Sequence, residues 1–585
     1  MNFSKISPLL LASLDASISE RERSDELNTG YNSTTQTWSV ILRYSGDFSD
    51  IYAILPDATR ASCVLLLSNY AILETDRAQI ELLSELSSVI YMEKPKRMFF
   101  EVVEASQASC IPTPTESLSY SGKGVLVGIV DSGIDYTHPD FRNPAGSSRI
   151  LALWDQTISP DAKLNFLPPT GYTIGTLFLK EQIDFALKQS NPSMRMSLCP
   201  SQDISGHGTL VTGIAAGNGR ASDGLYRGVA YEADLVIVKL STLNDGGFPN
   251  TIHLMEAANF CVQKALSLQR PMALNLSFGN TYGPHSGTSL VENFFNELSQ
   301  LGMLSIVTGS GNEGSSQGHF EGKLSAFETS SIPFTIGSFT PTLNIQLWKY
   351  FWDEVSLSLS SPLGLSFSIP DRVGSYRFSF GDTDCYVYVG EPAPYSIFQE
   401  IYIDLLPKNS YILSGIWTLR LTATSIKTGE FALWMPAAVT RNISTGFLYP
   451  SPETTLTIPS TASSLITVGA YDSRSLEQAP FSGRGYTFGT TQVKPDLVAP
   501  GVDITSCAPG GAYTTASGTS FAAPFVTGSC ACCMQWGILE QNVPYLYGEK
   551  MKAYLIRGTK KLPYASVYPN PSTGWGALCL RNVLL

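Results

Sequence analysis

Short, almost continuous apolar runs recur along much of the chain, and helical stretches separate them. They are found at residues 124–130 (GVLVGIV), 234–240 (DLVIVKL), 272–277 (MALNLS), 304–308 (LSIVT) and 465–470 (LITVGA). Strands that are apolar at nearly every position are typical of parallel sheets covered by helices on both faces. The pattern therefore predicts an α/β domain.

The first hundred residues follow another pattern. Trp38–Tyr44 and Val89–Met92 have the composition of strands, and Asp76–Ser87 has the spacing of an amphipathic helix. The next segment is rich in Pro, Ser and Thr, which favours a domain boundary near residues 95–115. We expect a small α+β unit that ends there.

Between residues 340 and 450 apolar and polar residues alternate, for example in VSLSLS (355–360) and GIWTLRLTA (415–423). A period of two is typical of antiparallel strands with one buried face. We interpret this stretch as an inserted antiparallel β-sandwich, a jelly roll. The predicted domains are residues 1–100, 101–335, 336–450 and 451–585, the second and fourth forming one α/β domain.

Length, composition and charge indicate a globular protein of more than one domain and disfavour some classes of partner. At 585 residues the chain is too long for one hydrophobic core, and 43% hydrophobic with 15% charged residues is a globular composition. A net charge of -12 without basic runs argues against nucleic acid or an anionic membrane as partner. No run reaches the ~18 apolar residues that span a bilayer. Asp15 directly follows the short N-terminal apolar run, so we expect no signal peptide.

The ten cysteines do not form a disulfide framework, and three of them crowd one segment, at Cys530, Cys532 and Cys533. We interpret them as reduced thiols that serve as small core residues, with metal binding as the weaker alternative. We predict no cofactor and expect a protein or peptide substrate.

Two residues occupy positions where an α/β sheet gathers functional groups. Asp131 follows strand 124–130, at the carboxyl end of a parallel strand. Alone, it would also fit phosphatases, nucleotide enzymes or a structural turn. His207 lies between glycines in DISGHGTLVTGIAAG (203–217), ahead of a helix of small residues. None of the five histidines forms HExxH, which weakens a zinc-hydrolase interpretation.

Two further residues complete a candidate site. Ser520 opens a small-residue helix in SGTSFAAP, where a nucleophilic hydroxyl would lie near the positive helix end; the alternative is a serine N-cap. Asn312, in the loop TGSGNEG (308–314), has a carboxamide that can stabilise an oxyanion, or it adopts a left-handed turn. The order Asp, His, Ser is that of subtilisin, not of chymotrypsin or α/β hydrolases.

The motifs VDSGIDYTHPDF, GHGTLVTGIAAG, NLSFG, GSGNEG and SGTSFAAP resemble those of the subtilase family, over about residues 115–335 and 450–585. The resemblance implies a subtilisin-like fold with a parallel seven-stranded sheet and a serine endopeptidase. Asp131 would support His207 as general base and acid, and Ser520 would attack the peptide carbonyl. Asn312 and the Ser520 backbone N–H would form the oxyanion hole.

The resemblance also implies substrate-binding residues. These are Leu276, Ser277, Phe278, Gly279, Gly309, Ser310 and Gly311. The first four would accept the substrate backbone as an antiparallel strand, and the last three would line the S1 pocket. Asp140 matches a calcium ligand of some subtilases, but the loop at 217–228 departs from the usual calcium loop, so we assign no metal.

The N-terminal α+β unit resembles a subtilase prodomain, which assists folding, inhibits the enzyme and would be cut off between about residues 96 and 110. Together with the insertion it is most similar to the Csp subgroup from spore-forming bacteria. Members tend to retain the cleaved prodomain, and some activate a cortex-lytic enzyme. The resemblance implies a bacterial zymogen that is cytoplasmic or spore-associated, or that leaves the cell by a non-classical route.

Other functions stay open. A pseudoprotease would keep the fold as a binding or signalling module. A latent zymogen would cut itself once and remain inhibited by its own prodomain. An esterase is disfavoured, because Ser520 lies in Gly-Thr-Ser-Phe-Ala and not in G-x-S-x-G.

Overall fold

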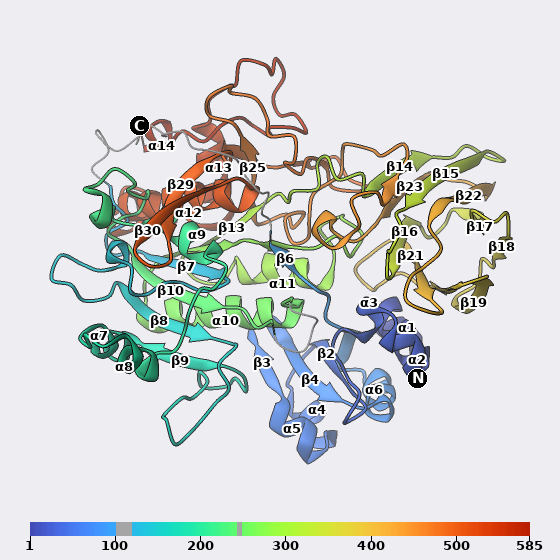
Figure 1. Ribbon diagram of the computed structural model, residues 1–585, viewed down its shortest axis with the longest axis horizontal. Coiled ribbons are helices and arrows are strands. Elements are labelled where there is room, and N and C mark those ends of the chain that lie inside the picture. Colours follow the sequence, from blue (N-terminus) through green and yellow to red (C-terminus); the bar gives the residue numbers. More distant parts are fainter. Residues whose placement is uncertain (101–119, 243–247, 585) are drawn as a thin grey trace.

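The computed structural model describes residues 1–100, 120–242 and 248–584. At its centre is an eight-stranded sheet of order β28-β25-β13-β11-β7-β10-β8-β9 (Figure 1). In that order the strands are Leu497–Pro500, Ile466–Tyr471, Leu304–Gly309, Met272–Leu276, Leu126–Asp131, Asp234–Lys239, Ile150–Asp155 and Thr176–Leu179. All pair in parallel except β9, which pairs antiparallel with β8. The seven-stranded prediction therefore omitted β9, a four-residue edge strand too short to show a clear pattern.

Helices cover both faces of the central sheet, α9 and α12 on one and α10 and α11 on the other. Their bounds are His207–Ala216, Thr519–Met534, Thr251–Leu268 and Leu290–Leu298. Within β7, Val127 and Ile129 belong to the core that contains α9 and α12, whereas Leu126 and Val130 belong to the core that contains α10 and α11. Successive side chains of a strand point to opposite faces, so two covered faces require the continuous apolar runs seen in the sequence.

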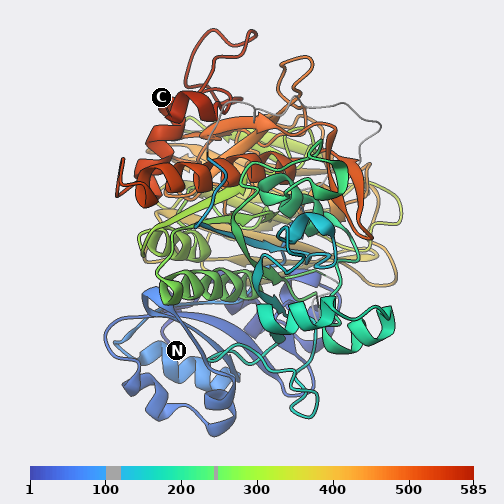
Figure 2. The same ribbon diagram turned by 90° about the vertical axis from the view of Figure 1, so that its left-hand side faces the viewer.

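The N-terminal unit is an antiparallel sheet with short helices, coloured blue in Figures 1 and 2. Its strands β1 to β5 are Tyr31–Asn32, Thr37–Tyr44, Val64–Leu66, Tyr70–Thr75 and Val89–Glu93, and helix α6 is Arg77–Glu85. The Asp76 carboxylate caps α6 by accepting the Gln79 N–H at 2.9 Å, and Ile80 and Leu83 are fully buried. Ile41 and Tyr70 share a core with α10 and α11, so the unit packs on that face of the α/β domain.

Two antiparallel sheets form the inserted sandwich, with a common apolar core between them. The six-stranded sheet has the order β14-β23-β16-β21-β20-β19, with bounds His319–Lys323, Glu430–Trp434, Leu343–Tyr350, Phe398–Pro407, Thr383–Val389 and Gly374–Phe380. The five-stranded sheet has the order β18-β17-β22-β15-β24, with bounds Ser366–Ile369, Glu354–Ser360, Gly415–Ser425, Thr329–Ile336 and Gly446–Phe447. The sandwich thus begins at His319, earlier than the predicted boundary at residue 336. Its description as a jelly roll stays a prediction.

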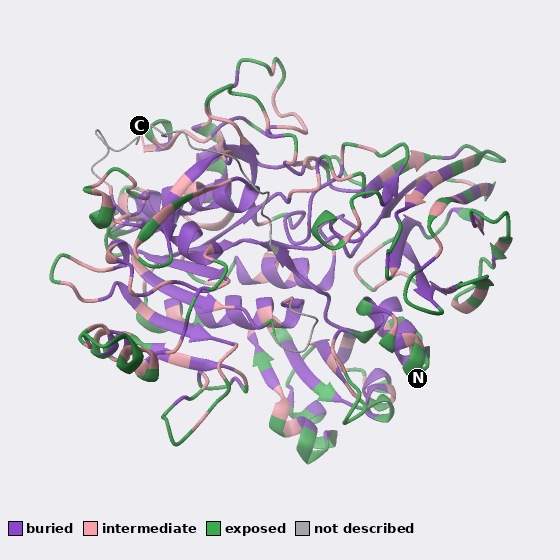
Figure 3. Cartoon of the chain, in the orientation of Figure 1, coloured by how far each residue is buried: buried purple, intermediate pink, exposed green. Residues whose placement is uncertain are grey.

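The sandwich shares a hydrophobic core with the N-terminal unit. Tyr386, Tyr388, Tyr402 and Leu406, on β20 and β21, cluster with apolar residues of α1 (Pro8–Asp15), β2 and β4. Every residue of β21 is therefore buried, unlike the half-buried β17 of the other sheet. Figure 3 shows buried strands at the centre of the molecule, whereas the peripheral helices α7 (Lys180–Leu187) and α8 (Pro192–Leu198) carry exposed residues.

The helix that starts with α12 and runs to Leu539 is long and apolar enough to cross a membrane, but 78% of its apolar window is buried inside the α/β domain. It packs against the central sheet as a core helix. Cys530, Cys532 and Cys533 on this helix are free and fully buried, which agrees with their predicted use as small core residues.

Buried carboxyl groups lie where the N-terminal unit meets the sandwich. Asp404 on β21 has no exposed surface and accepts hydrogen bonds from the hydroxyls of Ser24 and Tyr402. Burial raises the pKa of Asp404 to about 7, and the two hydroxyls only partly oppose this effect. Burial also raises the pKa of the neighbouring Glu400 to about 7. Both carboxyls are therefore protonated in the folded protein at mildly acid pH.

These pKa values predict a loss of stability as pH rises. The folded protein keeps the Asp404 proton up to about pH 7, whereas the unfolded chain releases it near pH 4. The stability that Asp404 contributes is therefore fully present below pH 4 and is lost progressively as the pH rises to about 7. Asp404→Asn should lose less of its thermal midpoint between pH 5 and pH 8 than wild type does. The exposed Asp382→Asn is the matched control, and an equal pH dependence in all three proteins would refute the assignment.

Candidate active site

The sheet places Asp131 and His207 in direct contact. Asp131 is the last residue of β7 and His207 the first of α9, and both are buried. His207 Nδ1 lies 2.6 Å from Asp131 Oδ1, and the Ser132 N–H donates to the same oxygen at 2.7 Å. A carboxylate can only accept, so Nδ1 carries the proton and Nε2 can act as a base.

Gly208 explains how α9 comes so close to the end of β7. A Cβ atom at this position would lie 2.2 Å from the Gly133 carbonyl oxygen and 3.1 Å from Asp131. No side chain fits there, so the glycine after His207 in the GHG motif is a packing requirement.

Asp203 links the end of strand β7, at Asp131, to the start of helix α9, at His207. Its Oδ1 accepts from the Ser132 hydroxyl (2.7 Å) and the Gly206 N–H (3.0 Å). Its Oδ2 accepts from the N–H (2.8 Å) and hydroxyl (2.7 Å) of Thr209. The sequence analysis did not single out Asp203; the available signal was an aspartate just before a helix that carries a candidate base. We assign Asp203 as a positioning residue.

Ser520 is the second residue of α12 and has no exposed surface. Its neighbour Phe521 has its ring centroid 5.1 Å from that of His207, which brings the start of α12 beside the imidazole. A Cβ at Gly528 would lie 2.6 Å from the Ala215 carbonyl oxygen, so small residues allow α12 to pack closely on α9.

Hydrogen bonds to its side-chain oxygen fix the Asn312 carboxamide, and its amide nitrogen is left available as a donor. Its Oδ1 accepts from the N–H (3.1 Å) and hydroxyl (3.2 Å) of Thr519, the residue before Ser520. Among the described residues, its buried Nδ2 has no hydrogen-bond partner. The left-handed backbone in this loop belongs to Gly311, with φ of 95°, and not to Asn312, so the left-handed-turn alternative is wrong.

The predicted substrate-binding segment already holds an antiparallel strand. Leu276 ends β11, and Phe278 and Gly279 form β12, which pairs with β6 (Phe99–Phe100) in the register Phe278 to Phe100 and Gly279 to Phe99. On the other side of β6, the Met98 N–H donates to the Pro249 carbonyl at 2.7 Å. The end of the N-terminal unit thus lies between two segments as an extended peptide would. Ser277 lies between β11 and β12 and is buried.

The candidate S1 residues follow strand β13. Gly309 ends β13, Ser310 is fully buried and donates its N–H to the Val468 carbonyl at 2.9 Å, and Gly311 donates its N–H to the Thr519 hydroxyl at 3.2 Å. These bonds fix the loop that leads into Asn312. The role of the three residues as a wall of S1 stays a prediction.

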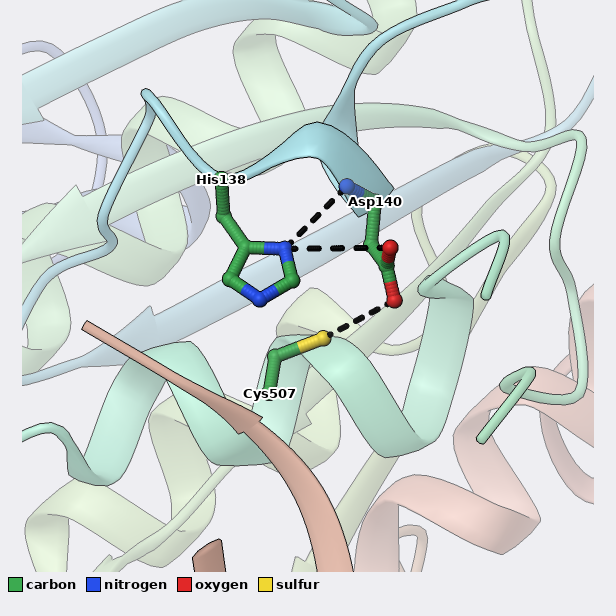
Figure 4. A group of neighbouring side chains, drawn as sticks. All are labelled: His138, Asp140 and Cys507. Carbon is green, nitrogen blue, oxygen red and sulfur yellow. Dashed lines mark hydrogen bonds and ion pairs between the residues drawn. The ribbon is translucent and has the colours of Figure 1, made fainter. Parts of the chain in front are cut away.

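Asp140 lies in a buried group with His138 and Cys507 (Figure 4). Its Oδ1 accepts from the Ala221 N–H (2.8 Å), and its Oδ2 accepts from the Tyr513 hydroxyl (2.8 Å) and the Cys507 thiol (3.3 Å). Burial and Asp140 raise the pKa of Cys507, which keeps the thiol protonated. His138 Nδ1 accepts the Asp140 N–H at 3.1 Å. The group offers one carboxylate beside an imidazole and a thiol, so it does not fit a calcium ion, which needs six to eight oxygen ligands.

Comparison with known proteins agrees with this geometry. The model of the subtilase family matches residues 122–348 and 445–576, more than half of the chain, and the chain therefore belongs to this family of serine endopeptidases. The model of the Csp protease B prodomain matches residues 4–96. The structure of the CspB protease of Clostridium perfringens is similar with a TM-score of 0.74 and 34% identity, covering 81% of this chain and 95% of that chain. The chain is thus a Csp-type subtilase.

Curated relatives are more distant. The minor extracellular protease Vpr of Bacillus subtilis is 25% identical over 80% of this chain, and the chain spans 52% of Vpr. The serine protease AprX of the same organism is 30% identical over 32% of this chain and 33% of AprX. The chain therefore spans about half or less of these relatives.

The hydrogen bonds of Asp203 predict a loss of activity when its carboxylate is replaced. In Asp203→Asn an amide NH₂ faces donors, so the Ser132 or Thr209 bonds are lost and the Asp131–His207 pair shifts. We expect kcat for peptide hydrolysis to fall roughly 10- to 100-fold with KM nearly unchanged. Asp223→Asn, an exposed change of equal charge, should behave as wild type. Normal kcat in Asp203→Asn would show that Asp203 does not position the pair.

Proposed function

We propose that the chain is a serine endopeptidase that works through Asp131, His207 and Ser520. The Ser520 hydroxyl attacks the peptide carbonyl carbon while its proton passes to His207 Nε2. The imidazolium is stabilised by Asp131 through the 2.6 Å contact, and it then protonates the leaving amine. Water, activated by the same imidazole, hydrolyses the acyl-enzyme and restores Ser520.

The oxyanion of each tetrahedral intermediate accepts hydrogen bonds from Asn312 Nδ2 and the Ser520 N–H. The observation that carries this assignment is the fixed Asn312 carboxamide, whose oxygen is held by Thr519 and whose buried nitrogen has no partner among the described residues. An unpartnered buried donor is unfavourable in a resting protein and is useful where negative charge develops.

The protein is made as a zymogen that cuts its own chain after the N-terminal unit. The pairing of β6 with β12 supports this, because it leads the chain through the cleft toward the catalytic residues. Residues 101–119, which contain most of the predicted cleavage range of 96–110, lie outside the described part of the structure. After cleavage the prodomain stays bound non-covalently. The shared aromatic core and the ion pairs Arg23–Asp384 (3.1 Å) and Arg377–Glu20 (2.5 Å) support its retention.

A latent enzyme is the second candidate function. Ser520 has no exposed surface, and β12 is occupied by the chain's own β6. In this state the protein would act as a binding or signalling module until the prodomain leaves. When active, the protein would cut another bacterial enzyme and activate it by limited proteolysis. It would act in the cytoplasm or associated with the spore.

The test of self-processing compares wild type with Ser520→Ala by intact mass and N-terminal sequencing. Wild type should yield two fragments cut between about residues 96 and 110, whereas Ser520→Ala lacks the nucleophile and should remain one chain. Ser529→Ala, on the same helix, should be cut as wild type is. If both proteins stay whole, a catalytically silent protein or a zymogen activated by another protease becomes the better interpretation, and if Ser520→Ala is cut, another protease is responsible.

The oxyanion assignment predicts that Asn312→Ala lowers kcat roughly 10²- to 10³-fold, because one donor to the developing charge is lost. The chain should still fold, with a lower thermal midpoint, because Thr519 loses the two hydrogen bonds that it donates to Asn312 Oδ1. Initial rates with a peptide substrate and the thermal midpoint measure the two effects. Asn409→Ala, exposed on the sandwich, is the control. Full activity of Asn312→Ala would contradict the assignment.

A further inference from the structure

Asn275 is a polar residue within the apolar core of the α/β domain. It lies on β11 and has no exposed surface. Its neighbours Leu274 and Leu276 belong to the core that contains α10 and α11, whereas Ala273 belongs to the core that contains α12. Because side chains alternate along a strand, the Asn275 carboxamide points toward the α12 face. A carboxamide is unfavourable in such a core unless its polar atoms are hydrogen-bonded.

Two hydroxyl groups form hydrogen bonds with the Asn275 carboxamide, one at each of its polar atoms. Thr527 on α12 donates its hydroxyl to Asn275 Oδ1 at 2.9 Å. Asn275 Nδ2 donates to the Ser277 hydroxyl at 2.7 Å. Thr527 and Ser277 are fully buried as well. The three side chains, here called the Asn275 network, therefore connect α12 to the residue that lies between β11 and β12.

The Asn275 network joins the two parts of the cleft that have to meet in the reaction. Thr527 and Ser520 are about two turns apart on α12, so their side chains lie on the same side of the helix. Ser277 directly precedes β12, which pairs with the chain's own β6 as it would with an extended peptide. Asn275 thus links the helix that carries the nucleophile to the segment that aligns the peptide backbone.

The oxyanion loop is attached to the same helix. The N–H and hydroxyl of Thr519 on α12 donate to Asn312 Oδ1. The nucleophile, the oxyanion donor and the peptide-binding segment are therefore all positioned from α12. A misplacement of about 1 Å between reacting groups can cost roughly 100-fold in rate, so the position of Ser277 relative to Ser520 affects turnover.

We propose that Asn275 and Thr527 are positioning residues that hold the peptide-binding segment, through Ser277, where the scissile carbonyl faces Ser520. When the network is broken, β12 still pairs with the peptide through its own backbone. What is lost is the alignment of the bound peptide with the nucleophile, so the chemical step slows. The assignment rests on the proposed function.

The test removes the Thr527 hydroxyl while keeping the shape of the side chain. Thr527→Val is made in the full-length chain, and the first-order rate of self-cleavage is followed by intact mass after cell-free synthesis. Cleavage should slow at least about tenfold, because Asn275 loses the bond that ties it to α12. Thr527→Ser keeps the hydroxyl and should be cut at close to the wild-type rate.

Thr212→Val is the matched control. The Thr527 hydroxyl also lies 3.2 Å from the Ala523 carbonyl, one turn earlier in its own helix. Thr212 is a buried threonine of α9 whose hydroxyl donates to the Gly208 carbonyl in the same way, at 2.7 Å. Thr212→Val therefore removes a bond of this kind without touching the Asn275 network, and it should be cut as wild type is.

A second variant tests whether Asn275 and Thr527 act as one unit. Asn275→Leu replaces the carboxamide by an apolar side chain of similar size, which suits the core but breaks the network. Asn275→Leu/Thr527→Val should be cut no more slowly than the slower single variant, because both changes remove the same connection. If Asn275→Leu does not fold, the rates of the two Thr527 variants and Thr212→Val decide.

Thermal midpoints separate positioning from stability. The same changes are made in Ser520→Ala, which is not cut, and their midpoints are measured. A positioning role predicts that Thr527→Val slows cleavage far more than Thr212→Val does at a similar loss of midpoint. A wild-type cleavage rate in Thr527→Val, or rates that simply follow the midpoints, would overturn the assignment. Failure of the proposed function gives a different result, because wild type itself then stays whole and no variant rate exists; that result removes the positioning role as well.

Discussion

The close packing of α9 and α12 against the carboxyl edge of the central sheet is the constraint on which the active site depends. Gly208 and Gly528 stand where any side chain would collide with a backbone carbonyl. Because these positions carry no Cβ, the two helix starts that bear His207 and Ser520 approach the end of β7. Asp203 links the end of β7 to the start of α9 through hydrogen bonds from Ser132 and Thr209. Catalytic geometry here is a result of helix packing.

The sequence predicted the elements that depend on local pattern. Continuous apolar runs such as 124–130 identify strands covered on both faces, and Asp131, His207 and Ser520 lie at the strand end and helix starts where the motifs placed them. The small residues of α12 likewise indicated a tightly packed helix. These predictions succeed because burial and close packing restrict the residue types that can occur within the segment itself.

Other features of the fold depend on contacts between segments that are distant in sequence, and the local sequence pattern does not indicate them. Every residue of β21 is buried because the N-terminal unit covers one face and the second sheet covers the other. Asp140 lies in a motif that elsewhere binds calcium, yet Tyr513 and Cys507, more than 360 residues away, occupy its carboxylate. The start of the sandwich at His319 was missed for the same reason, since β14 pairs with the distant strand β23.

The aromatic face formed by Tyr386, Tyr388 and Tyr402 has a consequence for the life of the protein after cleavage. This face is buried against the N-terminal unit. Departure of that unit would leave a sheet surface of large apolar rings in water, and such surfaces drive self-association and capture by chaperones. Release of the prodomain would thus make the remaining protein prone to aggregation over time. The N-terminal unit therefore shields the aromatic surface of the sandwich from water.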